Sequence, residues 1–280
     1  ALPIFALAGY LDHHAVKRII LLGKVEIHYL KDLSPRVRMQ RLEALMTKEL
    51  PAIIIGRRYL PPPEIITLCE KKQIPLFRCS KSTMKLMTRL TYLLSREFAP
   101  KINCHATLVE VFGLGVLIRG ESAVGKSEAA LGLIERGHRL VADDLVFIRK
   151  LEGPYLEGRG AELSNYHMEI RGIGIINVAN LYGAVCICEK KRINLVVELE
   201  NWQEDKFYQR VGLEEVYTDI LGVKVPWHLL PVKPGRDVVL LLETLALNQR
   251  LKKSGYHSAK ELQKKLEDTI KARTKKRILK

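Results

Sequence analysis

The chain has 280 residues, of which 47% are hydrophobic and 28% are charged, and its formal net charge at pH 7 is +15. These values are typical of a globular protein with room for two domains and argue against an intrinsically disordered chain. No apolar run is close to the length of about 20 residues that a helix needs to span a bilayer. The first nine residues lack the basic leader of a signal peptide, and the five cysteines form no C-x-x-C pair. We therefore expect a cytoplasmic protein with reduced thiols and no membrane contact.

The first 98 residues alternate between short apolar segments and helical patterns. Residues 18–30 indicate one or two strands, after which Ser34 is expected to cap a helix that has Pro35 at its first position. Further strands and helices follow the same alternation: strands over 52–56 and 74–78, and helices over 64–72 and 82–98. This order predicts a small N-terminal α/β domain over residues 1–98. No catalytic constellation appears in it, and its expected role is assembly or regulation.

A polar stretch around Pro100 predicts a linker over residues 99–104. The second domain, over 105–257, begins with strands at 107–112 and 115–119, which are expected to pair across Gly113 and Leu114. Later elements are less regular: a helix from 126 to about 137, mostly short strands and turns after 158, and an apolar helix over 238–251. The pattern predicts an α/β fold whose second domain combines a mixed sheet with helices.

The last segment, 258–280, is expected to be a basic helix or tail. From Leu251 to Lys280 there are eleven Lys or Arg and three Asp or Glu, a net charge of +8. Such a helix is more often a solvated face or a protein contact than a nucleic-acid reader. Because the chain has no basic stripe interleaved with aromatic residues, we expect no nucleic-acid partner.

One motif dominates the sequence. Eight consecutive residues fit the pattern G-x-x-x-x-G-K-[ST]: Gly120, Glu121, Ser122, Ala123, Val124, Gly125, Lys126 and Ser127. Glycines at its ends allow backbone N–H groups to face a phosphate, the lysine supplies a positive charge, and the serine hydroxyl is a ligand for Mg²⁺. An apolar strand before it and a helix after it complete a phosphate-binding loop, because a helix N-terminus also attracts anions.

Two further stretches carry candidate catalytic groups. Asp143 and Asp144 follow an apolar strand, and because neighbouring side chains on an extended segment point to opposite faces, we expect one of the two to face the nucleotide. That carboxylate could hold Mg²⁺ or act as a general base. Glu169 and Arg171 precede two glycines and a strand, where the carboxylate could ligate a metal and the guanidinium could clamp an oxyanion.

Taken together, these stretches resemble the HPr kinase/phosphorylase family of bacterial carbon regulation. The resemblance rests on blocks in the family's order: His105 with its neighbours, 120–128, 136–144, the signature 169–175, 208–213, 231–236 and 248–251. It covers the chain from about His105 to Leu251. It departs from the family at Ala106, where glycine is more usual, and at Lys233, where arginine is common.

The resemblance implies an ATP-dependent serine kinase that phosphorylates the phosphocarrier protein HPr. It also implies a phosphorylase that removes the phosphate with inorganic phosphate (Pi) and forms pyrophosphate, and a homohexameric assembly. In this sequence Lys126 and the loop amides would bind ATP, Ser127 and Glu169 would hold Mg²⁺, and Asp144 would exchange the serine proton. His105 and Arg210 match active-site positions. The segment tied to dephosphorylation comprises Pro231, Val232, Lys233, Pro234, Gly235 and Arg236.

Three other functions use the same loop. A P-loop kinase of a small metabolite is the nearest alternative, and the net charge motivates a nucleic-acid-associated NTPase. A nucleotide-binding regulator without turnover is the third, although the presence of both Asp144 and Glu169 argues against it.

Overall fold

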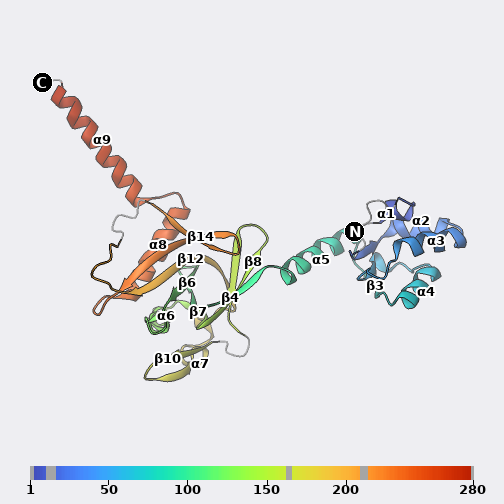
Figure 1. Cartoon of the computed structure of the whole chain (residues 1–280), viewed down its shortest axis with the longest axis horizontal. Coiled ribbons are helices and arrows are strands. Elements are labelled where there is room, and N and C mark those ends of the chain that lie inside the picture. The colour runs from blue at the N-terminus through green and yellow to red at the C-terminus, as the bar shows by residue number, and fades with distance from the viewer. Residues whose placement is uncertain (1–2, 11–16, 162–165, 209–213, 279–280) are drawn as a thin grey trace. The chain divides into compact units, whose positions relative to one another are not determined.

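The computed structural model describes residues 3–10, 17–161, 166–208 and 214–278, with side chains up to residue 271. The chain divides into two compact units, 1–98 and 99–280 (Figure 1). Each unit has its own hydrophobic core. The expected α/β class is confirmed in both units.

The first unit is built on a three-stranded parallel sheet in the order β1 (Ile20–Leu22), β2 (Ile53–Ile55) and β3 (Leu76–Arg78). Helices connect and cover the strands: α1 (Ile4–Leu7), α2 (Lys24–Asp32), α3 (Pro35–Leu45), the short 3-10 turn η1 (Gly56–Arg58), α4 (Pro63–Lys72) and α5 (Thr83–Glu97). Ser34 is the N-cap of α3 with Pro35 at the first helical position, as predicted. Parallel strands need such crossover connections, and here they are helical.

The expectation of a second strand before residue 30 is wrong. The alternating segment continues instead as helix α2, whose buried residues are Glu26, Ile27 and Leu30. Glu26 accepts a hydrogen bond from the Gly23 backbone N–H at 2.8 Å, which satisfies one free donor at the helix start. A capping carboxylate and the i, i+3, i+4 burial pattern therefore override the local alternation.

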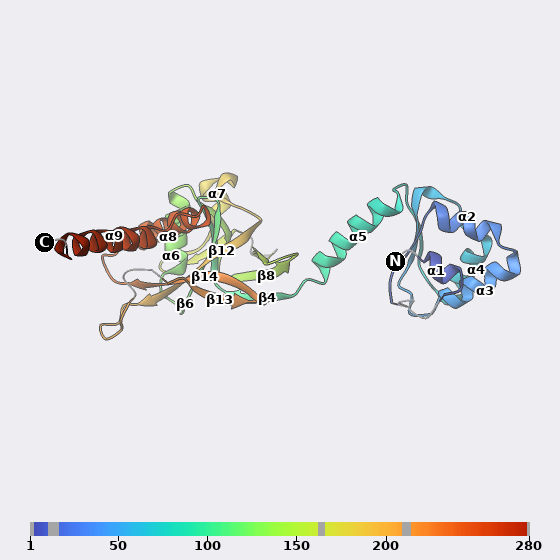
Figure 2. The same ribbon diagram turned by 90° about the horizontal axis from the view of Figure 1, so that it is seen from above.

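The second unit contains a mixed sheet, which among the described residues has nine strands (Figures 1 and 2). Its main path is β4 (Lys101–His105), β8 (Leu145–Leu151), β9 (Tyr155–Arg159), β12 (Lys190–Asn201), β6 (Leu114–Gly120), β5 (Thr107–Val111) and β7 (Arg139–Ala142). β14 (Val223–Val232) pairs with β12 in parallel and with β13 (Val216–Ile220) in antiparallel fashion. Because β6, β12 and β14 are parallel neighbours, the segments after them leave from one edge of the sheet.

Two sequence expectations for this unit are corrected. The polar linker expected over 99–104 is strand from Lys101 onward, because β4 pairs with β8 over five residues. The turn between β5 and β6 is Phe112 and Gly113, with φ angles of 48° and 84°, and Leu114 already belongs to β6. Left-handed values at both positions suit a tight two-residue hairpin. Most strands after Gly158 are short, as expected, and the exceptions are β12 with 12 residues and β14 with 10.

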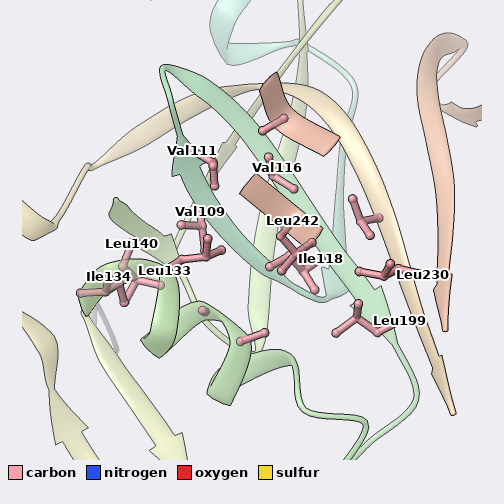
Figure 3. Close-up of a cluster of buried hydrophobic side chains, with 14 of the residues drawn as sticks. Val109, Val111, Val116, Ile118, Leu133, Ile134, Leu140, Leu199, Leu230 and Leu242 are labelled. Atoms are coloured by element: carbon pink, nitrogen blue, oxygen red, sulfur yellow. The ribbon is translucent and has the colours of Figure 1, made fainter. Parts of the chain in front are cut away.

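Helices α6 (Lys126–Glu135) and α8 (Val238–Lys253) pack on the sheet around one core. Side chains from β5, β6, β7, β12, β14 and both helices meet there, as Figure 3 shows for Val109, Val111, Val116, Ile118, Leu133, Ile134, Leu140, Leu199, Leu230 and Leu242. Burial of these apolar side chains fixes α6 against β6, and so holds the intervening loop in place.

The remaining elements of this unit lie outside the nine-stranded sheet. A separate hairpin joins β10 (His167–Ile170) to β11 (Gly174–Asn177), and it leads to α7 (Val178–Tyr182) and the turn η2 (Ala184–Cys186). The last helix, α9 (Ser258–Ile278), confirms the expected basic helix. Within the described part of the chain, no helix is both long and apolar enough to traverse a lipid bilayer.

Candidate active site

The loop between β6 and α6 has the geometry of a phosphate cradle. It runs from Gly120, the last residue of β6, to Gly125, the N-cap of α6. Lys126 Nζ donates hydrogen bonds to the carbonyl oxygens of Gly120 at 2.9 Å and Glu121 at 2.7 Å, so its ammonium lies across the loop. A helix N-terminus and a lysine positive charge therefore meet at one place, which suits an anion.

The two glycines of the motif, Gly120 and Gly125, are required for different structural reasons. A Cβ on Gly125, whose φ is 97°, would meet no atom within 4 Å, so open space lies on that side of the loop. A Cβ on Gly120 would lie 2.4 Å from the carbonyl oxygen of Leu199 on β12. Gly120 is thus required by strand packing as well as by the turn, a reason that the motif alone does not reveal.

Asp143 faces the start of α6. Its Oδ1 and Oδ2 accept hydrogen bonds from Ser127 Oγ at 3.2 and 3.0 Å, and Oδ1 also accepts one from Thr107 Oγ1 at 2.7 Å. Burial raises the pKa of the Asp143 carboxyl, and the hydrogen bonds from Thr107 and Ser127 offset only part of that rise. Sequence reasoning missed Thr107, because only the pairing of β5 with β7 brings it beside Asp143.

Asp144 points elsewhere. Its side chain is 83% exposed, and Oδ1 lies 3.5 Å from Nδ1 of His105, whose side chain is 82% exposed. Asp144 has a φ of 63°, an uncommon value for a residue other than glycine. Its carbonyl accepts a hydrogen bond from the amide of Ala106 at 3.1 Å, which ties the turn to the end of β4. The structure thus brings Asp144, which is expected to exchange the serine proton, beside His105, which is expected at an active-site position, although the two lie 39 positions apart in the sequence.

Glu169 and Arg171 lie on the β10–β11 hairpin. The flanking Met168 and Ile170 are buried in the core that also holds Ala129 and Leu133 of α6, and this packing fixes the hairpin beside that helix. Glu169 and Arg171 are exposed. Among the described residues, no group of three or more His, Cys, Asp or Glu side chains forms a ready metal site. A Mg²⁺ ligand role for Glu169 stays a prediction.

The segment Pro231–Arg236 leaves the same sheet edge as the phosphate loop. Pro231 and Val232 complete β14, and Arg236 Nη1 donates to the Pro231 carbonyl at 3.0 Å, closing a tight turn before α8. Lys233 Nζ lies 5.6 Å from the ring centroid of Trp202. Arg210, the remaining predicted catalytic residue, lies outside the described residues.

A cavity of about 1,090 Å³ borders this turn. It lies between β14, α8 and the segment after β12, and its lining includes Trp202, Tyr208, Pro231 and Arg236 but none of the loop residues 120–127. Trp202 and Tyr208 were not singled out individually by sequence reasoning, because isolated aromatic residues in a loop carry no recognisable pattern.

The arrangement as a whole defines a class. An apolar strand, a glycine-framed loop, a helix with Lys126 and Ser127 at its start, and a neighbouring Asp143 are the parts of a P-loop phosphotransferase site. Comparison with known proteins gives the particular family. Residues 2–94 match the model described as HPr Serine kinase N terminus, and residues 96–266 match the HPr Serine kinase C-terminal domain. The chain belongs to the HPr serine kinase family.

Individual relatives agree with this assignment. The chain is 43% identical to HPr kinase/phosphorylase of Caldicellulosiruptor bescii, over 95% of this chain and 85% of the relative. It is 48% identical to the HPr kinase/phosphorylase of Treponema pallidum strain Nichols, over 92% and 82%. A solved structure of the Hpr(Ser) kinase/phosphatase from Coxiella burnetii is 38% identical, with a TM-score of 0.51, and the match covers 57% of this chain and 98% of that one.

Proposed function

We propose that this protein transfers the γ-phosphoryl group of ATP to a serine of HPr, and that the same site removes the phosphate with Pi. The observation that carries this proposal is that two neighbouring carboxylates make different contacts. Asp143 is held by Ser127 at the phosphate loop, whereas Asp144 is exposed beside His105. In this proposal, Asp143 serves the nucleotide and its metal, and Asp144 serves the incoming substrate.

In the forward direction, the serine oxygen attacks the γ-phosphorus, the bond to the β–γ bridging oxygen breaks, and ADP leaves. Asp144 accepts the serine proton, and His105 at 3.5 Å orients that carboxylate. Lys126 and the loop amides neutralise the phosphate oxygens and position them. In reverse, an oxygen of Pi attacks the phosphoserine, Asp144 returns the proton to the departing serine oxygen, and pyrophosphate forms.

Mg²⁺ fits the oxygen donors of this site. The Ser127 hydroxyl and the Asp143 carboxylate lie together, and hydroxyl and carboxylate oxygens are the ligands that Mg²⁺ favours. Glu169, exposed on the neighbouring hairpin, is the further ligand in this proposal. When bound, the ion supplies charge neutralisation at the phosphoryl group.

Several broader features belong to the same proposal. By analogy with its family we infer a homohexamer in the cytoplasm, with unit 1–98 serving assembly or regulation. Light scattering of the purified full chain measures the assembly state, and a species smaller than a hexamer at enzyme-assay concentrations would contradict that part.

The main test is transfer from labelled ATP to purified HPr with Mg²⁺, followed by addition of Pi to the phosphorylated product. Wild type should label HPr and then release pyrophosphate, and Asp144→Asn should lose both reactions because it cannot exchange the proton. Transfer without pyrophosphate would leave a kinase only. No transfer to HPr would instead favour a P-loop kinase of a small metabolite.

A further inference from the structure

Two stacked aromatic rings stand just after β12. The ring centroids of Trp202 and Tyr208 lie 4.9 Å apart with an interplanar angle of 28°. The Trp202 amide donates to the Val232 carbonyl at 2.8 Å, and the Tyr208 hydroxyl donates to Glu200 Oε1 at 3.1 Å. The Gln203 amide donates to the same hydroxyl at 3.2 Å. These contacts fix the pair on the sheet edge, and Trp202 nevertheless stays 40% exposed.

The pair lies next to the phosphate loop. On β12, Leu199 pairs in parallel register with Gly120 of β6 on one side and with Leu230 of β14 on the other. Trp202 follows three residues later, so it emerges between the loop that begins at Gly120 and the turn at Lys233. Adjacent strands lie about 4.8 Å apart. A nucleoside triphosphate is much longer than this spacing, so a nucleotide bound at the loop after β6 can extend past the end of β12.

Asp143 and Asp144 lie on the other side of the loop. Asp144 follows β7, which pairs with β5, and β5 pairs with β6 on the side away from β12. This step rests on the proposed function: the terminal phosphate of ATP must lie near Asp144. Because the phosphates form a linear chain, the nucleoside at the other end leaves the loop over β12 and β14.

Lys233 makes only a weak contact with the Trp202 ring. Lys233 Nζ, 5.6 Å from the Trp202 centroid, is near the outer limit of a cation–π interaction. A flat base stacked on a tryptophan binds more strongly than such an exposed ammonium. We infer that Trp202, supported by Tyr208, stacks on the nucleobase of ATP, and that the base takes the ring surface near Lys233.

Equilibrium binding without HPr separates the base from the phosphates. Calorimetry compares ATP with inorganic tripolyphosphate, which has the three phosphates and no nucleoside. We expect Trp202→Leu to weaken ATP binding about tenfold and to leave tripolyphosphate binding within about twofold. Trp202→Phe keeps a stacking ring and should restore most of the ATP affinity. Phe207→Leu is the matched control, because Phe207 is 86% exposed in the same segment.

Three results would overturn the inference. Equal loss of both ligands in Trp202→Leu would mean that the ring merely supports the loop. Unchanged ATP affinity with a raised KM for HPr would assign the ring to the protein substrate. Wild-type protein that binds ATP no more tightly than tripolyphosphate would exclude any base site. Binding of neither ligand would overturn the proposed function itself, and so the two failures are distinguishable.

Discussion

Ser127 Oγ donates hydrogen bonds to both carboxylate oxygens of Asp143, at 3.2 and 3.0 Å. The serine is the second residue of α6 and the aspartate directly follows β7, so one side-chain contact joins the phosphate loop to the acidic turn. The adjacent Asp144 makes its contact with His105 instead. This separation of two consecutive carboxylates underlies the first two predictions.

Asp143→Asn should stabilise the protein without nucleotide at neutral pH while weakening Mg²⁺-dependent ATP binding. Burial raises the pKa of this carboxyl above its unfolded value of about 3.9. The native carboxyl therefore holds its proton more tightly, and its contribution to stability is present below the unfolded pKa and lost as pH rises through the folded pKa. Melting temperatures from pH 4 to 7 measure the difference, which should grow with pH. A difference that shrinks with rising pH would contradict this assignment.

His105→Ala should lower kcat for phosphoryl transfer about tenfold to a hundredfold and leave ADP affinity nearly unchanged. His105 contacts Asp144 and not the phosphate loop, and both side chains are exposed, so the loss concerns the proton transfer. Steady-state kinetics with HPr, beside ADP titration, separate the two effects. A parallel loss of ADP affinity would place His105 in nucleotide binding.

The two motif glycines should respond differently to alanine. Gly120→Ala places a Cβ 2.4 Å from a backbone oxygen of Leu199, so β6 and β12 must shift apart. We expect a loss of unfolding free energy of about 2 kcal/mol or more from overpacking and backbone strain. Gly125→Ala meets open space and should cost only about 1 kcal/mol for its positive φ. Urea denaturation compares them, and equal losses would contradict the packing argument.

Glu243 should stabilise the junction of α6 and α8 at neutral pH. Burial acts to raise its pKa, but hydrogen bonds from His138 Nε2 at 2.9 Å and Arg136 Nη1 at 2.8 Å outweigh burial, and the pKa is lowered. The stabilisation is therefore present above the unfolded pKa of about 4.3 and lost as pH falls. Glu243→Gln should cost about 1 kcal/mol at pH 7.

The control for that prediction is Glu152→Gln, because Glu152 is exposed in the turn between β8 and β9. Chemical denaturation should show a larger Glu243→Gln deficit at pH 7 than at pH 4, because the stabilisation declines as pH falls from the unfolded pKa toward the lowered folded pKa. An equal loss of unfolding free energy at both pH values would indicate that Glu243 stabilises the junction by packing rather than by its charge.

Local sequence determined the parts of this protein whose physics is local. The phosphate loop follows from glycine conformation, a lysine and a helix start within eight residues, and the N-cap at Ser34 follows from adjacent positions. The alternation of apolar and polar residues over 18–30 is also compatible with a second strand. The capping carboxylate and the buried face of α2 make the second half of this segment a helix instead.

Tertiary structure decided what depends on distant pairing. Thr107 meets Asp143 because β5 and β7 are neighbours, Gly120 is restricted by Leu199 because β12 passes beside it, and residues from Lys101 onward become a strand because β8 supplies a partner. In each case the deciding atoms belong to segments tens of residues apart. Their contacts arise from sheet order and core packing, which no local pattern encodes.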